Sequence, residues 1–372
     1  MGFLTIGDTR ASSFYPETMA ISPAFTSKFR SELLAWFKEY GRKLPWRGTD
    51  NPYYIWVSEI ILQQTQVKQG WDYYLRFIET FPDVKALAEA DEEVLLRVWQ
   101  GLGYYSRAHN MRRAAIQIME EYGGRFPKTA DDIAKLKGIG PYTTAAIGSI
   151  AFGLPLAVVD GNVYRVLSRL LADETPIDTT EGKKHYAAIA SELLAPEAPS
   201  RYNQAIMDFG AMVCTPKNPS CGACPLSEIC LSFDTELPEL LPIKARKTAV
   251  KEEELHFYLL QKGSHIAVEK RDKTGIWKGL YQFPILKEAP ADWQETETFK
   301  LKDHRLTHRL LHITVHHCRP KTGAGSAVKA EGSDRDGKSV LPYSFIPIQE
   351  HHKLAFPKPL RHFLDTRFPP DK

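Results

Sequence analysis

Hydrophobic residues recur every three to four positions through most of residues 27–230, which is the spacing of amphipathic α-helices. Proline and glycine interrupt this pattern at short intervals, as at Phe81-Pro82, Gly123-Gly124 and Gly153-Leu154-Pro155, and mark the ends of helices. The pattern predicts an all-α domain with helices over residues 27–40, 54–69, 71–80, 92–99, 106–122, 129–136, 142–152, 162–171, 181–194 and 202–213.

The pattern changes after residue 230. Leu237-Pro238, Leu241-Pro242 and the basic stretch Lys244-Ala245-Arg246-Lys247 predict a linker over residues 231–252, and its positive charges suit a phosphate backbone. Runs rich in β-branched and aromatic residues then predict strands at 255–260, 265–269, 280–283 and 311–316. We expect residues 253–372 to form a smaller α+β domain, with a loop at 321–338, and residues 1–26 to form a tail that starts at Met1 or Met19.

Composition narrows the class of protein. A chain of 372 residues with 43% hydrophobic content can bury a sizeable core, which favours two domains and excludes a disordered protein. A net charge of +3 is compatible with a polyanionic partner without requiring one. No apolar run reaches membrane-spanning length, and Asp8, Arg10 and Glu17 argue against a signal peptide, so we expect a soluble cytoplasmic protein without a membrane partner.

Four of the five cysteines are clustered as Cys214-x6-Cys221-x2-Cys224-x5-Cys230. Gaps this short let a loop fold back so that all four thiolates face one metal centre. Two disulfides or four unrelated thiols are the alternatives, and they are disfavoured in a chain without secretory features. Zinc and a four-iron cluster both remain open on spacing alone.

A glycine-rich turn, Gly138-Ile139-Gly140-Pro141, joins two predicted helices. Two glycines permit a tight hairpin with exposed backbone N–H groups, and the helix that follows presents its positive end, which can hold a phosphate. Taken alone, this is also an ordinary helix-turn-helix connection.

Two carboxylates stand out against apolar surroundings. Asp160 ends an apolar run just before a helix, and Glu59 is a single acid among Ile55, Trp56 and Ile60. Asp160 could be a simple N-cap, and Glu59 could be the solvent-facing position of a buried helix. A glutamate held by apolar walls can act as a general acid near neutral pH, and with an ionised aspartate it provides the two groups that cleavage of a glycosidic bond requires.

Six motifs together resemble the adenine DNA glycosylases, members of the helix-hairpin-helix superfamily that includes endonuclease III. The resemblance runs in order from about residue 27 to 250 and rests on Leu44-Pro45-Trp46-Arg47, residues 58–67 (SEIILQQTQV), residues 101–107 (GLGYYSR), Gly138-Ile139-Gly140, residues 159–163 (VDGNV) and the four cysteines. It implies a helix-hairpin-helix glycosylase domain at 27–230, with a [4Fe-4S] cluster in the loop 214–230 held by Cys214, Cys221, Cys224 and Cys230.

The resemblance also implies roles for single residues. Glu59 would protonate the adenine ring and Asp160 would stabilise the C1′ cation, while Tyr142 and Asn162 position these groups. The residues implied in DNA contact, wedging or pairing are Arg47, Leu62, Gln64, Tyr104, Gly138 and Gly140. Packing of Tyr104 beside a glycine turn, and closure of a helix end by Arg47, are the ordinary alternatives.

Tyr142 separates this chain from relatives that also cut the DNA strand. Such enzymes carry a lysine two residues after the second hairpin glycine, and its amine forms a Schiff base with C1′. A phenol cannot form an imine, so we expect a monofunctional hydrolase that leaves an abasic site. Its expected partner is duplex DNA with adenine opposite 8-oxoguanine or guanine, and we expect it to act as a monomer in the bacterial nucleoid.

The last domain is similar to the Nudix-like module that this family uses to recognise 8-oxoguanine. The glutamate-rich box of a Nudix hydrolase is missing from residues 250–372, so we expect a binding module. Where the family usually has Phe-Ser-His, this chain has Leu306-Thr307-His308, so Thr307 and His308 are the expected lesion contacts. The histidines at 304–317 are more simply surface residues than metal ligands, and Cys318 is expected to be a structural thiol.

Three other functions remain open. An endonuclease III-like glycosylase-lyase for oxidised pyrimidines would share the hairpin, the aspartate and the cysteines. A non-catalytic metal-cluster DNA-binding protein would need only the hairpin and the cluster. A nucleotide hydrolase would need the missing Nudix box.

Overall fold

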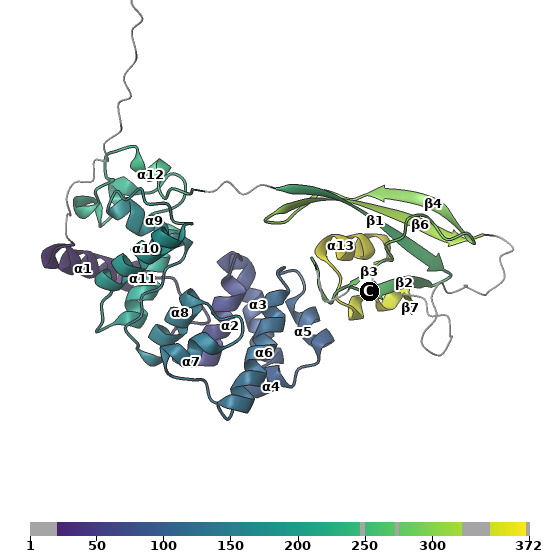
Figure 1. Cartoon of the computed structure of the whole chain (residues 1–372), viewed down its shortest axis with the longest axis horizontal. Helices are drawn as coiled ribbons and strands as arrows, with labels where there is room; N and C mark the ends of the chain where they lie inside the picture. Colours follow the sequence, from purple (N-terminus) through teal and green to yellow (C-terminus); the bar gives the residue numbers. More distant parts are fainter. Residues whose placement is uncertain (1–20, 246–249, 272–274, 322–342, 370–372) are drawn as a thin grey trace, which may run out of the picture. The chain divides into compact units, whose positions relative to one another are not determined.

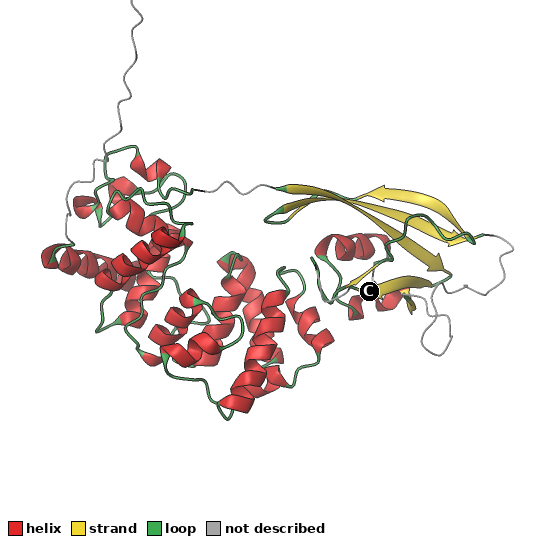
Figure 2. Cartoon of the chain, in the orientation of Figure 1, coloured by secondary structure: helices red, strands yellow, loops and turns green. Residues whose placement is uncertain are grey.

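The computed structural model describes residues 21–245, 250–271, 275–321 and 343–369. Three predicted segments lie partly or largely outside these ranges. They are the tail (residues 1–20), the linker (Arg246 and Lys247) and the loop (residues 322–338). In the described part, helices fill the chain up to residue 240, and the strands begin at Lys251 (Figure 2). The predicted succession of a helical region and an α+β region is therefore confirmed.

The helices of the described region are α1 (Pro23–Tyr40), α2 (Pro52–Leu62), α3 (Val67–Thr80), α4 (Val84–Ala88), α5 (Glu92–Trp99), α6 (Ser106–Glu121), α7 (Ala130–Lys135), α8 (Pro141–Phe152), α9 (Gly161–Leu170), α10 (Thr180–Leu193), α11 (Pro199–Met212), α12 (Leu237–Leu240) and α13 (Lys358–Arg367). Most begin at a residue that caps the free N–H groups of the first turn. Ser22 and Asn51 do so just ahead of a proline, and Thr129 and Thr179 do so for α7 and α10.

One predicted helix is wrong. The run 54–69 is interrupted, because α2 ends at Leu62 and α3 begins at Val67. The intervening Gln64 adopts a left-handed backbone with φ of 58°. Neither glycine nor proline marks this break in the sequence, so periodicity alone extended the helix through it.

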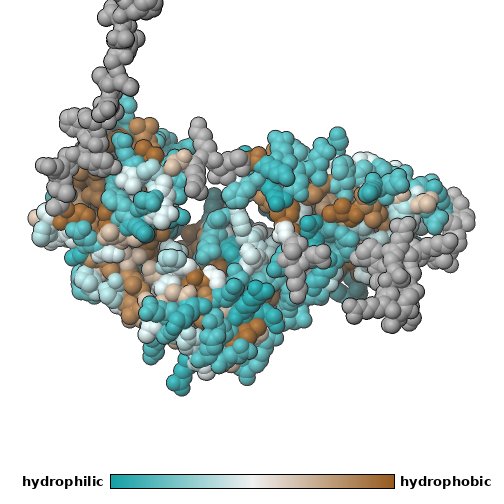
Figure 3. Space-filling model, viewed as in Figure 1, coloured by the Kyte–Doolittle hydropathy of each residue, from teal (hydrophilic) through white to brown (hydrophobic). Residues whose placement is uncertain are grey.

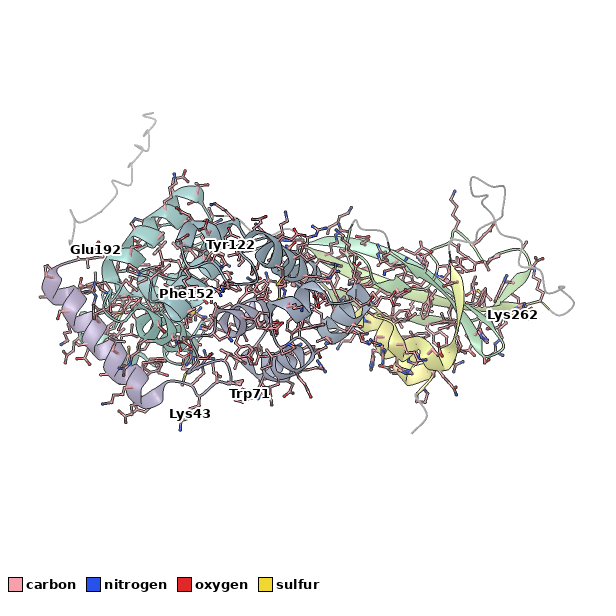
Figure 4. The ribbon with its side chains drawn as sticks, turned by 90° about the horizontal axis from the view of Figure 1, so that it is seen from below. Lys43, Trp71, Tyr122, Phe152, Glu192 and Lys262 are labelled. Atoms are coloured by element: carbon pink, nitrogen blue, oxygen red, sulfur yellow. The ribbon has the colours of Figure 1, made fainter. Side chains whose placement is uncertain are left out.

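The chain divides into two compact units, and the helices are shared between them. Unit 1 comprises residues 1–42 and 153–245, and unit 2 comprises residues 43–152 and 246–372. Figure 4 labels Lys43 and Phe152, the two ends of the first stretch of unit 2. In unit 1, Trp36 of α1 meets Phe209 of α11 edge to face, with ring centroids 5.1 Å apart. In unit 2, one core cluster extends from Trp46 to Ile147 and also takes in Leu280 and Ala355.

The sheet of unit 2 has the strand order β3-β2-β1-β6-β4, with β5 paired to β6 and β7 to β2. Its strands are β1 (Lys251–Lys262), β2 (His265–Lys270), β3 (Tyr281–Gln282), β4 (Trp293–Lys300), β5 (His304–Arg305), β6 (Arg309–Pro320) and β7 (Ser344–Pro347). β1 and β6 run parallel in register from Lys251 opposite Arg309 to Leu260 opposite Cys318. Helix α13 lies along one face (Figure 1), where Leu360, Phe363 and Leu364 share a core with strand residues.

Hydrophilic residues cover much of the visible surface, with hydrophobic areas between them, as is usual for a globular chain (Figure 3). Among the described residues, no helix is long and apolar enough to cross a membrane.

Candidate active site and cysteine loop

Glu59 lies on α2 among buried neighbours and is only 8% exposed, so it is not the solvent-facing position of that helix. Helix α8 packs against α2 and brings Tyr142, in its first turn, to the same place. The hydroxyl of Tyr142 donates a hydrogen bond to Oε2 of Glu59 at 2.5 Å. The structure thus joins two of the residues that the sequence singled out.

The glycine turn connects α7 to α8 as expected. Gly138 has φ of +80°, and a Cβ there would lie 2.6 Å from Cβ of Asn110, so glycine is required on both counts. Two backbone donors of the turn are used within the protein: the N–H of Lys137 donates to Oε1 of Gln117 (3.2 Å), and that of Ile139 donates to the carbonyl of Leu136 (3.1 Å). Gly138 and Gly140 are exposed, which leaves this surface accessible to a phosphate.

Gln64 and Tyr104 share an unusual feature, a left-handed backbone at a residue other than glycine. Gln64 has φ of 58° and Tyr104 has φ of 45°, and both side chains are exposed. Such backbones cost free energy and concentrate at functional sites. Leu62 ends α2 and is partly buried, and Arg47 follows a turn in which its N–H donates to the carbonyl of Leu44 (3.0 Å).

Asp160 caps α9 and also anchors Asn162. Its Oδ1 accepts from the backbone N–H groups of Asn162 (2.9 Å) and Val163 (2.8 Å), and its Oδ2 accepts from Nδ2 of Asn162 (2.9 Å). Burial raises the pKa of Asp160 above its ordinary value, while the N–H donors and the nearby Arg165 oppose that shift. The prediction that Asp160 is an N-cap is therefore confirmed, and the same carboxylate remains a candidate catalytic group.

Arg165 continues this chain of hydrogen bonds toward the cysteines. Its Nη2 donates to Oδ1 of Asn162 (2.9 Å) and to the carbonyl of Gly210 (2.6 Å), and its Nε donates to the carbonyl of Cys214 (2.8 Å). Arg165 is 8% exposed. Asp160, Asn162, Arg165 and the backbone of the first cysteine thus form one connected network within unit 1.

The cysteine loop folds around a single cavity. All four cysteines of the cluster motif line it, together with apolar residues of α9 and α11 and with Arg169. Nη1 of Arg169 donates to Sγ of Cys214 at 3.4 Å and to the carbonyl of Thr215 at 2.7 Å, so a positive charge lies beside the first sulfur of the motif. Two short 3-10 turns, Cys221–Ala223 and Ser227–Ile229, lie within the loop.

The donor set fits a metal centre held by four sulfur ligands. Four thiols around a cavity are what an iron-sulfur cluster requires. Across the ranges that the structure describes, no three Cys, His, Asp or Glu residues gather tightly enough to hold one metal ion.

In the C-terminal part of unit 2, Thr307 and His308 are both exposed in the turn between β5 and β6. The hydroxyl of Thr307 shares a hydrogen bond with that of Tyr104. Leu306, which stands where the resemblance expects an aromatic, packs against the core of the module. His312 pairs instead with Asp303, in the loop between β4 and β5, and His316 pairs with Glu295 on β4.

No functional or structural role was assigned from the sequence to three arginines that the structure places near the candidate site: Arg107, Arg165 and Arg169. One signal was available: Arg165 and Arg169 are four residues apart in α9, so they share one helix face that also carries apolar residues. A pair of arginines there indicates buried carbonyls or anions to be satisfied.

The two hydrogen-bonded pairs lie in different units. Glu59 and Tyr142 belong to unit 2, and Asp160 and Asn162 belong to unit 1.

Comparisons with known families match three stretches of the chain. Residues 57–195 match the HhH-GPD superfamily base excision DNA repair proteins. Residues 214–230 match the iron-sulfur binding domain of endonuclease III, and residues 255–366 match the NUDIX domain. These stretches contain the carboxylates, the cysteines and the Thr307 turn, respectively.

Similar proteins extend over most of the chain. An adenine DNA glycosylase of Buchnera aphidicola subsp. Baizongia pistaciae is 35% identical over 303 residues, covering 78% of this chain and 85% of the relative. One from Buchnera aphidicola subsp. Schizaphis graminum is 31% identical over 348 residues, covering 91% and 98%. Among solved structures, a thermostable thymine-DNA glycosylase matches with a TM-score of 0.52 and 28% identity, over 56% of this chain and 96% of that one.

Proposed function

The chain belongs to the adenine DNA glycosylases of the helix-hairpin-helix superfamily, and we propose that it hydrolyses the glycosidic bond of adenine that lies opposite 8-oxoguanine or guanine. It is a base excision repair glycosylase that acts on duplex DNA and contains a [4Fe-4S] cluster. The mispair, the monofunctional reaction and the role of each residue are the proposal.

The hydrogen bond from Tyr142 to Glu59 carries this proposal. Position 142 holds an amine in strand-cutting relatives and the phenol of Tyr142 in this chain. The hydroxyl of that phenol is hydrogen-bonded to the carboxyl group of Glu59. With no amine at this position to attack C1′, water is the acceptor of the sugar. Because Tyr142 donates to Oε2, the proton that Glu59 gives to adenine is carried on Oε1.

The two carboxylates divide the reaction between them. Glu59 protonates the adenine ring, so the base departs neutral when the bond from its nitrogen to C1′ breaks. The carboxylate of Asp160 stabilises the positive charge left on the sugar, and its orientation is fixed by the three N–H donors of Asn162 and Val163. Glu59, now ionised, takes a proton from the water that attacks C1′, which leaves an abasic site and restores the acid.

Base extrusion and recognition of the opposite base use unit 2. Gln64, Leu62 and Tyr104 are suited to wedge into the stack when adenine leaves it, because an enzyme that acts on a base in a duplex must extrude it. The shared hydrogen bond of Tyr104 and Thr307 supports a joint role in which the Thr307–His308 turn recognises 8-oxoguanine beside the wedge. The DNA phosphate backbone is contacted by Arg47, Gly138 and Gly140.

The cluster, held by Cys214, Cys221, Cys224 and Cys230, contributes structure and no reacting group. Bound there, it would fix the loop that contains the exposed Lys217, which is suited to contact phosphates; Arg165 links the backbone of Cys214 in this loop to Asn162. We propose that the protein acts as a monomer.

Single-turnover cleavage of an end-labelled duplex tests the proposal. With adenine opposite 8-oxoguanine, strand breaks should appear only after hot alkali, and Glu59→Gln should abolish them. Glu120→Gln, at an exposed position of α6, is the matched control and should react like the wild type. Breaks without alkali would establish lyase activity, and removal of thymine or an oxidised pyrimidine instead of adenine would refute the substrate.

A further inference from the structure

Arg107, near the start of α6, reaches two separate loops with one guanidinium group. Its Nη1 donates to the carbonyl oxygens of Ile60 (2.7 Å), Ile61 (3.2 Å) and Gln63 (2.7 Å), where α2 ends just before Gln64. Its Nη2 donates to the carbonyl oxygens of Leu102 (3.2 Å) and Gly103 (3.3 Å), just before Tyr104. One side chain therefore joins the segments that present both wedge residues.

The end of α2 needs such a partner. The last carbonyls of a helix lack intrahelical donors and form the negative end of its dipole, and α2 has no basic residue in its last turn. Arg107 supplies both the donors and the charge from another helix. Burial lowers the pKa of Arg107 to about 10, which still leaves it charged at neutral pH. A lysine has a single nitrogen and cannot reach both loops at once.

The two loops are strained where Arg107 holds them. Gln64 and Tyr104 both have left-handed backbones, which persist only where the surroundings enforce them. Two further hydrogen bonds anchor the Tyr104 loop. Nε1 of Trp99 donates to the carbonyl oxygen of Gly103 (3.1 Å), and the hydroxyl of Tyr73 donates to the carbonyl oxygen of Gln100 (2.7 Å). Arg107 also stacks over the rings of Trp99 and Tyr104, at 5.2 and 5.8 Å from their centroids.

We infer that Arg107 is a positioning residue. It holds the backbone at Gln64 and at Tyr104 in fixed positions relative to one another, so that the two side chains together extrude the target base. This rests on the proposed function, since it assumes that these two residues act as the wedge. It predicts a defect in extrusion and not in bond cleavage, and the two can be separated by the choice of substrate.

Two duplexes and three variants provide the test. One duplex has adenine opposite 8-oxoguanine in fully paired surroundings, and the other places the same adenine in a short unpaired bubble, where extrusion costs little. Arg107→Met should slow single-turnover excision from the paired duplex by about 100-fold, the loss expected from a misplacement of about 1 Å. On the bubble its rate should return close to that of the wild type.

Arg112→Met is the matched control. Arg112 lies on the same helix, and its Nε donates to the carbonyl of Ala90 (2.8 Å), which belongs to neither wedge loop. It should leave the ratio of the two rates unchanged. Arg107→Lys should give a smaller loss on the paired duplex and serves in place of Arg107→Met if that variant does not fold.

An equal loss on both duplexes, or no loss on either, overturns the inference. A wild-type protein that removes adenine from neither duplex refutes the proposed function, and the inference with it. Rates are compared at saturating enzyme with the folded fraction measured by circular dichroism, so that lower stability alone does not count as a defect.

Discussion

Replacing Asp160 with asparagine separates the two roles of this residue, because asparagine caps a helix as well as aspartate does but carries no charge. In the structure the carboxylate accepts hydrogen bonds from two backbone N–H groups and from the side chain of Asn162. An amide oxygen at position 160 can keep both backbone bonds. The bond from Nδ2 of Asn162 is lost, because an NH2 group cannot accept it.

The expected effect on stability is small and depends on pH. The lost Asn162 bond is worth about 1 kcal/mol, which is offset by removing a buried carboxylate. Burial raises the pKa of Asp160 above the ordinary 3.8, so Asp160 stabilises the fold most when protonated, and this contribution is lost as the pH rises through the raised value. The unfolding free energy of Asp160→Asn relative to wild type should therefore improve from pH 4 to pH 7.

The effect on activity should be large. Loss of a charge aimed at the developing cation costs about 10² to 10³ in rate. Urea denaturation at several pH values and single-turnover excision measure the two effects on the same samples. Asp160→Ala is the control, since it removes the cap and should cost about 2 kcal/mol. An active Asp160→Asn variant would show that Asp160 is only an N-cap, and a relative stability that falls with pH would refute the burial argument.

Three further changes test other parts of the site. Tyr142→Lys places an amine beside Glu59, so borohydride should trap a covalent protein-DNA adduct that the wild type does not give; absence of the adduct would place C1′ elsewhere. Thr307→Val keeps the shape but removes the hydroxyl, and it should reduce the preference for 8-oxoguanine over guanine by about tenfold, the worth of one hydrogen bond; an equal loss with both bases would contradict direct recognition. Arg165→Met leaves the carbonyls of Gly210 and Cys214 without their donor and should lower the unfolding free energy by roughly 3 kcal/mol, together with the iron-to-protein ratio; unchanged iron content would separate the network from the cluster.

Periodicity located the first two helices but placed their starts too late, at residues 27 and 54. The structure begins α1 at Pro23 and α2 at Pro52, so residues 23–26 of the predicted tail are helical. The local signals Ser22-Pro23 and Asn51-Pro52, a cap followed by a proline, mark both starts. The break at 63–66 could not be predicted in this way, because the donors to the last carbonyls of α2 come from Arg107, more than forty residues away. Strand β4 was missed because only one of its eight residues, Trp293, is buried, so no alternation shows in the sequence.

The candidate site was predictable as a set of residues and not as an arrangement. Motifs indicated Glu59, Tyr142, Asp160, Asn162 and the cysteines, and the structure adds which of them meet. The division of the chain was hidden, because unit 1 takes its first helix from residues before 43 and the rest from residues after 152. A chain that leaves a unit and returns to it leaves no mark in local hydrophobic periodicity.

Three arginines, two buried and one half-buried, explain how this chain maintains irregular backbone near its functional groups. Arg107, Arg165 and Arg169 each donate to several backbone carbonyls that face loops or helix ends, where no regular ladder of hydrogen bonds can satisfy them. A buried carbonyl without a donor costs about 1 to 3 kcal/mol, so each of these side chains decides whether its loop can remain in an irregular conformation. Arginine suits this task because its planar group presents five donors in fixed directions, and it keeps its charge when buried. The loops that present Gln64, Tyr104 and the cysteines therefore receive their hydrogen bonds from side chains of regular helices, which stabilises the left-handed backbone at Gln64 and Tyr104.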